Sequence, residues 1–152
     1  MIDEKFKVLI VDDDSTLREL LSETIHGMGY MVDTAENGED ALNKLKREKY
    51  DLVVSDLKMP GMDGLKLLDH IKSLDSNILV IIITAYATLE SAVKAIEKGA
   101  YDYIAKPFRL DEFVVVVRNA CEKLRLLRQR DSLLEELRGA YAELERLRKD
   151  AG

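Results

Sequence analysis

The sequence predicts an α/β protein with a small, doubly wound parallel sheet, followed by one long helix. Over the first two thirds of the 152 residues, short and nearly continuous apolar runs alternate with amphipathic stretches. Parallel strands that helices cover on both faces are apolar on both sides, so these runs fit buried strands. From about residue 110 onward no strand pattern returns, and about forty residues follow without a proline.

The predicted elements follow one another in a regular order. β-branched and other apolar residues predict five strands, at 6–11, 30–34, 52–55, 78–83 and 101–105. Apolar residues at helical spacing predict four helices, at about 15–27, 38–48, 64–74 and 88–98. Gly27, Gly29 and Gly99 stand where helices are expected to end. Since helices separate parallel strands, the carboxyl ends of the strands should share one edge, where such sheets bind ligands.

The C-terminal segment carries an apolar stripe in two parts. Steps of four and three residues join Phe113, Val117, Ala120, Leu124 and Leu127, then Leu134, Leu137, Tyr141 and Leu144. The phase slips between the two parts, near Arg130 and Asp131. We expect the first half to pack on the sheet and the second to form a coiled coil, with a solvated and frayed helix as the alternative. The predicted domains are therefore 1–125 and 126–152.

Composition and charge exclude several classes of protein. With 47% hydrophobic and 34% charged residues, the chain has the composition of a soluble globular protein. No apolar run approaches the roughly 20 residues of a membrane span, and the N-terminus lacks the features of a secretory signal. The net charge of the chain is −6. Residues 118–150 hold nine Lys/Arg and seven Asp/Glu, a net charge of +2, so residues 1–117 have a net charge of −8. We expect a cytoplasmic protein that binds neither membranes nor nucleic acid directly.

Polar side chains follow four of the five predicted strands. They are Asp12, Asp13 and Asp14 after the first strand, Asp56 after the third, Thr84 after the fourth and Lys106 after the fifth. Carboxylates gathered in one crevice repel one another unless a cation neutralises them, and all-oxygen ligands suit Mg²⁺. Magnesium leaves room for a phosphoryl oxygen, and Lys106 and Thr84 can bind two further phosphoryl oxygens. Because no Ser, Cys or His stands beside a base, the expected nucleophile is a carboxylate.

Each of these residues also has an ordinary structural interpretation. Asp14 or Ser15 could cap the following helix, and Asp56 could open the tight turn at 58–61. Lys106 could be an exposed lysine. Their joint occurrence at successive strand ends favours the functional interpretation.

These motifs resemble the receiver domain of two-component response regulators. The resemblance covers about residues 5 to 125. It rests on Val11-Asp12-Asp13, Ser55-Asp56, the loop at 59–64, Thr84-Ala85 and Lys106-Pro107-Phe108. It implies a flavodoxin-like sheet with the strand order 2-1-3-4-5. It also implies that Asp56 is the phosphoacceptor.

The resemblance further implies a role for each residue of the site. The expected Mg²⁺ ligands are Asp12, largely through water, Asp13, Asp56 and the backbone carbonyl of Lys58. Thr84 and Lys106 are expected to bind the phosphoryl group, and Tyr103 to rotate inward on activation. Apart from the resemblance, we hypothesise that Lys58 and Tyr86 tune the lifetime of the phosphorylated state, with a surface tyrosine of no kinetic effect as the alternative for Tyr86.

The long helix is similar to the linker of transcription activators of the NtrC and DctD class. The receiver resemblance implies a sensor histidine kinase as phosphodonor, and the predicted coiled coil implies a homodimer through the C-terminal helix. Output is expected through the fourth helix, fifth strand and fifth helix. The chain has no phosphate-binding loop of ATPases and no helix-turn-helix. It either ends naturally or has been cut before its effector, and we expect the cut, with a transcription-activating effector domain outside the chain. As a switch and not an enzyme, it should only phosphorylate itself from a phosphodonor and slowly dephosphorylate itself.

Two alternatives remain open. Asp12-Asp13-Asp14-Ser15-Thr16 also satisfies the Asp-x-Asp-x-Thr motif of haloacid-dehalogenase-type phosphatases, in which Asp12 would be the nucleophile and Asp14 the acid. The spacing of the remaining site residues fits a receiver better. The other alternative is a dimerisation module that has lost its chemistry, against which the intact set of site residues argues.

Overall fold

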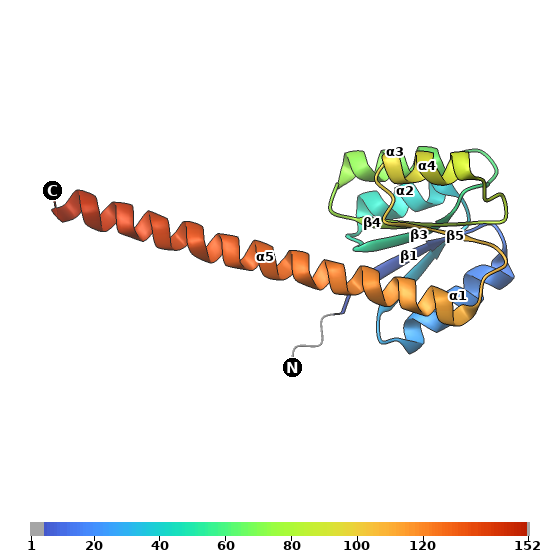
Figure 1. Cartoon of the computed structure of the whole chain (residues 1–152), viewed down its shortest axis with the longest axis horizontal. Coiled ribbons are helices and arrows are strands. Elements are labelled where there is room, and N and C mark those ends of the chain that lie inside the picture. The colour runs from blue at the N-terminus through green and yellow to red at the C-terminus, as the bar shows by residue number, and fades with distance from the viewer. Residues whose placement is uncertain (1–4, 152) are drawn as a thin grey trace. The chain divides into compact units, whose positions relative to one another are not determined.

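Five parallel strands form one sheet in the order β2-β1-β3-β4-β5 (Figure 1). The computed structural model describes residues 5–151. The strands are β1 (Lys7–Val11), β2 (Met31–Ala35), β3 (Leu52–Asp56), β4 (Leu79–Thr84) and β5 (Asp102–Ala105). The predicted α/β class and strand order are confirmed, and each strand begins and ends within one residue of its predicted bounds.

Helices cover both faces of this sheet. One face carries α2 (Gly38–Arg47), α3 (Gly64–Leu74) and α4 (Leu89–Glu97), and the other carries α1 (Ser15–Gly27) and the first turns of α5 (Leu110–Ala151) (Figure 1). In β1, Leu9 and Val11 join the core cluster that contains Leu67 of α3. Val8 and Ile10 point to the opposite face and are equally buried. Burial on both faces explains why the strands are continuous apolar runs.

Side-chain caps fix the beginnings of four helices. The cap residues accept backbone N–H bonds of the first turn and are Asp14, Asn37, Asp63 and Thr88. Asp14 therefore caps α1, which leaves Asp12 and Asp13 for the carboxyl edge of the sheet. At the other ends, Gly29 and Gly99 adopt φ values of 94° and 101°, as expected for residues that follow a helix. Gly27 instead lies within the last turn of α1, so the prediction of a cap there was wrong.

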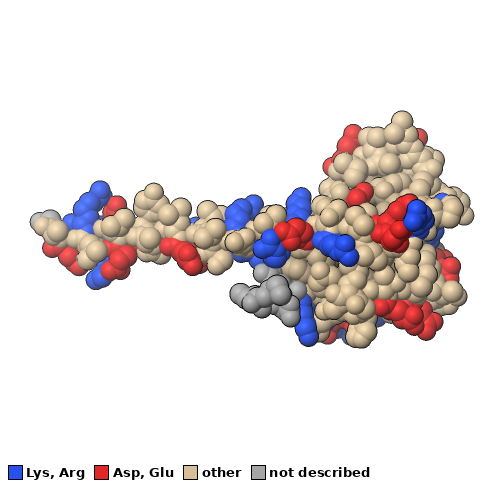
Figure 2. Space-filling view, turned by 60° about the horizontal axis from the view of Figure 1, so that its bottom comes forward, with Lys and Arg blue, Asp and Glu red and all other residues tan. Residues whose placement is uncertain are grey.

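The chain divides into two units after Cys121, and α5 contributes to both. In the first unit, Phe113, Val117 and Ala120 of α5 are fully buried, as the first part of the stripe predicts. In the second unit, every residue from 128 to 151 is exposed. On the face that Figure 2 shows, acidic and basic side chains alternate along this part of the chain. Within residues 5–151, no helix has both the length and the apolar character needed to cross a membrane.

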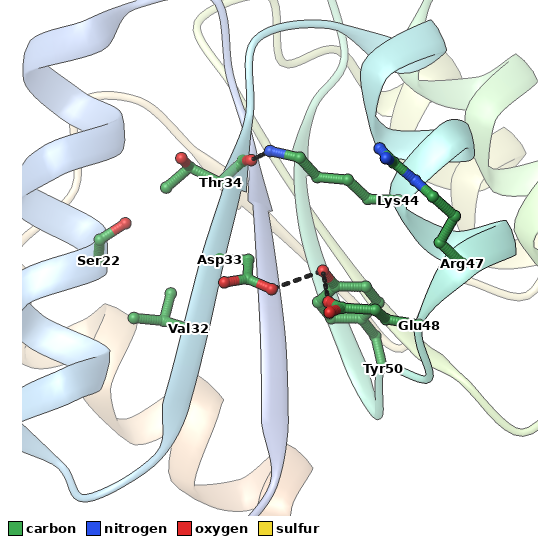
Figure 3. A pocket seen from close by; sticks show the side chains of 8 residues that line it. All are labelled: Ser22, Val32, Asp33, Thr34, Lys44, Arg47, Glu48 and Tyr50. Atoms are coloured by element: carbon green, nitrogen blue, oxygen red, sulfur yellow. Dashed lines mark hydrogen bonds between the residues drawn. The ribbon is translucent and has the colours of Figure 1, made fainter.

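A hollow of about 500 Å³ lies beside β2, at the edge of the sheet (Figure 3). The hydroxyl of Tyr50 lies 2.6 Å from the carboxylate of Asp33 and 3.1 Å from that of Glu48. Burial raises the pKa of Tyr50, and the hydrogen bond from Tyr50 lowers the pKa of Asp33. The ammonium group of Lys44 donates to the backbone carbonyl of Thr34. These groups bind one another, so they serve to attach β2 and α2 to the sheet.

Candidate functional site

The predicted site residues meet at the carboxyl edge of the sheet. Asp12 and Asp13 directly follow β1, Asp56 ends β3, Thr84 ends β4, and Lys106 follows β5. The ammonium group of Lys106 lies 3.3 Å from a carboxylate oxygen of Asp12 and 3.3 Å from one of Asp56. Residues that are 94 and 50 positions apart in sequence are thus in direct contact, because parallel strands end at the same edge.

Three carboxylates form a compact cluster at this edge. One oxygen from each of Asp12, Asp13 and Asp56 lies within 4.8 Å of the others. Asp12 is 3% exposed and Asp56 8% exposed, whereas Asp13 is open to solvent. Negative charges this close together repel one another, and oxygen ligands with one open side fit a hard divalent cation. The cluster could therefore hold Mg²⁺ and leave part of its coordination sphere to another ligand.

Burial and charge act against each other in this cluster. Burial raises the pKa of Asp12, although the backbone N–H of Asp14 and the ammonium group of Lys106 act in the opposite direction. For Lys106, burial favours a lower pKa, but the carboxylates of Asp12 and Asp56 outweigh it, and the pKa is raised. Lys106 is therefore charged at neutral pH and can bind an anionic group beside Asp56.

The loop after β3 presses closely against the start of α3. The backbone N–H of Gly64 donates to the carbonyl of Leu57 at 2.8 Å. A Cβ atom on Gly64 would lie 2.9 Å from the Cα of Leu57 and would collide with the carbonyl oxygen of Asp56. The backbone N–H of Lys58 lies 3.3 Å from a carboxylate oxygen of Asp56. The glycine thus lets α3 support the backbone that carries the Asp56 carboxylate.

Gly64→Ala is expected to destabilise the fold by about 1–3 kcal/mol, because the backbone of residues 56 and 57 must shift to admit the methyl group. Gly27→Ala is the matched control, since a Cβ there meets no atom within 4 Å and the residue is helical. That change should be neutral or stabilise by up to about 1 kcal/mol. Urea denaturation of both variants measures the difference, and equal stabilities would contradict this account of Gly64.

Thr84 and Tyr103, two of the three residues predicted to take part in the switch, form hydrogen bonds next to the cluster. The hydroxyl of Thr84 is fully buried and accepts the backbone N–H of Tyr86 at 3.0 Å. The hydroxyl of Tyr103 lies 2.6 Å from that of Ser91 in α4. Sequence reasoning missed Ser91, although the Thr88-x-x-Ser91 pattern at a helix start could have drawn attention to it.

The two predicted tuning residues lie beside each other. The ammonium group of Lys58 lies 5.7 Å from the ring centroid of Tyr86, which is within cation–π range. Both line a hollow of about 410 Å³ between the loop after β3 and the first turn of α4. Their spacing in sequence gave no reason to expect this contact.

Comparisons with known proteins agree with this geometry. A family model described as "Response regulator receiver domain" matches residues 8–118. The chain is 45% identical over 113 residues to the DNA-binding transcriptional regulator NtrC of Escherichia coli K12, with 74% of this chain and 24% of NtrC covered. It is 44% identical over 117 residues to sporulation initiation phosphotransferase F of Bacillus subtilis, with 77% of this chain and 91% of the relative covered.

A solved structure extends the comparison to three dimensions. The solution structure of the beryllofluoride-activated NtrC4 receiver domain dimer superposes with a TM-score of 0.74 at 36% identity, covering 78% of this chain and 98% of that chain. The chain spans about a quarter of the length of NtrC. It therefore belongs to the response regulator receiver domain family, the phosphoacceptor domains of two-component signalling.

Proposed function

We propose that Asp56 is the residue that accepts a phosphoryl group, with a sensor histidine kinase as the donor. The main support for this proposal is the contact of Lys106 with both Asp12 and Asp56. This contact places a positive charge beside a carboxylate, at the edge of the sheet where the parallel strands end. A carboxylate oxygen of Asp56 attacks the phosphorus atom, and the bond from phosphorus to the donor imidazole nitrogen breaks. The imidazole leaves with that electron pair, and Asp56 becomes an acyl phosphate.

The neighbouring side chains provide complementary bonds to the transferred group. Lys106 places its ammonium group 3.3 Å from Asp56 and can bind one phosphoryl oxygen. The hydroxyl of Thr84 can donate to a second phosphoryl oxygen once it rotates. Asp12, Asp13, Asp56 and the backbone carbonyl of Lys58 are the proposed Mg²⁺ ligands. Bound Mg²⁺ would neutralise the carboxylates and the incoming phosphoryl charge.

Locating the phosphoryl group tests this proposal. The wild-type chain is incubated with Mg²⁺ and a small acyl-phosphate donor, and intact-mass spectrometry counts the added groups. Reduction of the acyl phosphate with borohydride, followed by peptide mapping, then identifies the modified residue. A single group on Asp56 supports the proposal. A group on Asp12 would support the phosphatase alternative, and no modification would support a module without chemistry.

We propose that Tyr86 slows loss of the phosphoryl group. Tyr86 is 62% exposed, and its ring centroid lies 5.7 Å from the ammonium group of Lys58, two residues after the acceptor. In this position the ring can restrict the approach of water. Tyr86→Ala is expected to speed loss of the acyl phosphate several-fold. Mass spectrometry of the purified phosphorylated chain over time measures the rate, with Tyr141→Ala, an exposed tyrosine of the second unit, as control. An unchanged rate in Tyr86→Ala would remove this role.

We further propose that the C-terminal helix forms a homodimer and passes on the change from the α4-β5-α5 face. Four large side chains at coiled-coil spacing support this, Leu134, Leu137, Tyr141 and Leu144, which are 43–64% exposed. Leu133 and Leu147 are also exposed and make the stripe wider than a strict two-position seam. Such a row of exposed apolar side chains is expected to be buried against a second copy.

Replacing Leu137 and Leu144 together with asparagine is expected to weaken the dimer at least tenfold, because two buried leucines would be lost from each helix. Multi-angle light scattering of the full chain across a concentration series gives the dissociation constant. Ala142→Asn changes a residue outside the stripe of the same helix and is the matched control. A monomeric wild-type chain at every concentration would reject the homodimer.

We also propose domain bounds, an output domain and a cellular location for the switch. We propose a receiver domain over residues 1–125 and a helical linker over 126–152, a division that limited proteolysis can test. The partial coverage of NtrC supports a transcription-activating effector domain as the output. A cytoplasmic location and the lack of direct contacts with nucleic acid or membranes are part of the proposal, supported by the net charge of −6 and the interleaved charges of α5.

A further inference from the structure

A hydrogen bond between two elements fixes the side chain of Tyr103. Its hydroxyl lies 2.6 Å from the hydroxyl of Ser91, twelve residues earlier. Tyr103 belongs to β5, is half-buried, and packs against the core cluster on the α2-α3-α4 face of the sheet. Ser91 lies in the first turn of α4. The position of the Tyr103 ring is therefore linked to the beginning of α4.

The same serine hydroxyl also completes the cap of α4. It accepts the backbone N–H of Thr88 at 3.2 Å and donates to the Thr88 carbonyl at 3.1 Å. A hydroxyl has one proton and two acceptor positions. Thr88 thus provides a partner for the Ser91 proton and for its acceptor positions, and either hydroxyl can be the donor in the bond between Ser91 and Tyr103.

The Ser91 hydroxyl keeps its partners within Thr88 when Tyr103 leaves. The side-chain hydroxyl of Thr88 donates to that of Ser91 at 2.9 Å, and the Ser91 proton can be donated to the Thr88 carbonyl. The Ser91 N–H still donates to the Thr88 hydroxyl at 3.0 Å in either case. Departure of Tyr103 thus leaves no unsatisfied group at Ser91 and does not open the cap. A bond that can be exchanged at so small a cost is suited to a side chain that moves.

The Thr88–Ser91 cap is joined to the phosphoacceptor edge by a short segment. Thr84 ends β4, its hydroxyl accepts the N–H of Tyr86, and Thr88 follows two residues later. When the Thr84 hydroxyl turns towards a phosphoryl oxygen, its bond to Tyr86 is altered and residues 85–88 must adjust. The hollow of about 410 Å³ is lined by Tyr86, Thr88 and Ser91 and provides space for that adjustment.

We propose that Ser91 is a positioning residue for the switch, whose hydroxyl holds Tyr103 in the unphosphorylated position and releases it when Asp56 is phosphorylated. The inference rests on the proposed roles of Asp56, Thr84 and Tyr103. The Ser91–Tyr103 bond stabilises the inactive arrangement alone, so its removal shifts the equilibrium towards the active arrangement. Any ligand that prefers the active arrangement then binds more tightly.

The test uses beryllofluoride with Mg²⁺ as a phosphoryl mimic on the full chain. Ser91→Ala and Tyr103→Phe each remove the bond, and Tyr103→Phe leaves the cap of α4 intact. Each variant is expected to bind beryllofluoride about 2- to 12-fold more tightly, which is the fold-change for one net hydrogen bond. The double variant should show no further gain, because both changes remove the same bond. NMR titration that follows the backbone amide signal of residue 103 gives the affinity and reports on the ring environment.

Two controls separate positioning from capping. Ser91→Thr keeps the hydroxyl and should bind beryllofluoride as the wild type does, whereas Ser73→Ala changes an exposed serine of α3 and should have no effect. The inference is overturned if Tyr103→Phe binds like the wild type, or if the two changes add in the double variant. In that outcome the Ser91 and Tyr103 variants would still bind beryllofluoride through Asp56, so the proposed phosphoacceptor would be unaffected. Binding that persists in Asp56→Asn would instead show that the proposed phosphoacceptor is wrong.

Discussion

Asp56→Asn is expected to abolish stable phosphorylation of the chain. The amide of asparagine keeps the size of the side chain but lacks the anionic oxygen that attacks phosphorus. Intact-mass spectrometry after incubation with Mg²⁺ and an acyl-phosphate donor should show no added group, whereas the wild type gains one. We expect the loss to be complete, because Asp12 should not accept the group in place of Asp56. Asp12 is 3% exposed, and its carboxylate already binds Lys106 and the N–H of Asp14.

Two comparisons make the Asp56 result specific. Asp69→Asn replaces an exposed carboxylate of α3 and should be phosphorylated like the wild type. Circular dichroism of Asp56→Asn should match the wild type, because Lys106 keeps its partner Asp12. Full phosphorylation of Asp56→Asn would move the acceptor to another carboxylate, with Asp12 the first to examine.

Asp13→Asn and Lys106→Met are expected to change Mg²⁺ affinity in opposite directions. Asp13→Asn removes one of three clustered carboxylates, so the dissociation constant for Mg²⁺ should rise at least tenfold. Lys106→Met removes a positive charge 3.3 Å from two of those carboxylates, so Mg²⁺ should bind more tightly. Isothermal titration calorimetry measures both constants. Weaker binding in Lys106→Met would show that the lysine orders the carboxylates instead of competing with the cation.

The same titration should depend on pH through Asp12. Because burial raises the pKa of Asp12, its carboxylate takes up a proton at a higher pH than an ordinary aspartate does. A protonated carboxyl group is a poor ligand, so Mg²⁺ affinity should fall on acidification from above the usual titration range of aspartate. Asp12→Asn should remove most of this pH dependence. A pH profile that is unchanged in Asp12→Asn would assign the effect to another group.

The fold and the general location of the site were predictable from sequence because both depend on local patterns. Continuous apolar runs such as 78–83 identified buried strands, and Asp56 and Lys106 could be assigned to one edge because parallel strands end together. Asp14 was one of the predicted helix caps, and it caps α1. None of these conclusions requires knowledge of side-chain rotamers.

Contacts that depend on rotamers and on packing between elements were not predictable. The Ser91–Tyr103 bond joins residues of α4 and β5, and nothing in their spacing favours it over a bond to water. The Lys58–Tyr86 contact likewise needs the loops after β3 and β4 to approach each other. Gly64 could be recognised as part of a turn, but its close contact with the backbone of Asp56 depends on the docking of α3.

The bond from Lys44 to the carbonyl of Thr34 has a consequence for self-association. β2 is an outer strand of the sheet, and the carbonyl of Ala35 binds the N–H of Asp12, so the Thr34 carbonyl faces away from β1. An outer strand with free backbone acceptors is a template on which a strand of another molecule can add and start aggregation. Lys44 occupies one such acceptor and puts a positive charge at the open edge. We therefore expect the side chain that joins α2 to the sheet also to oppose edge-to-edge polymerisation in concentrated solutions of the chain.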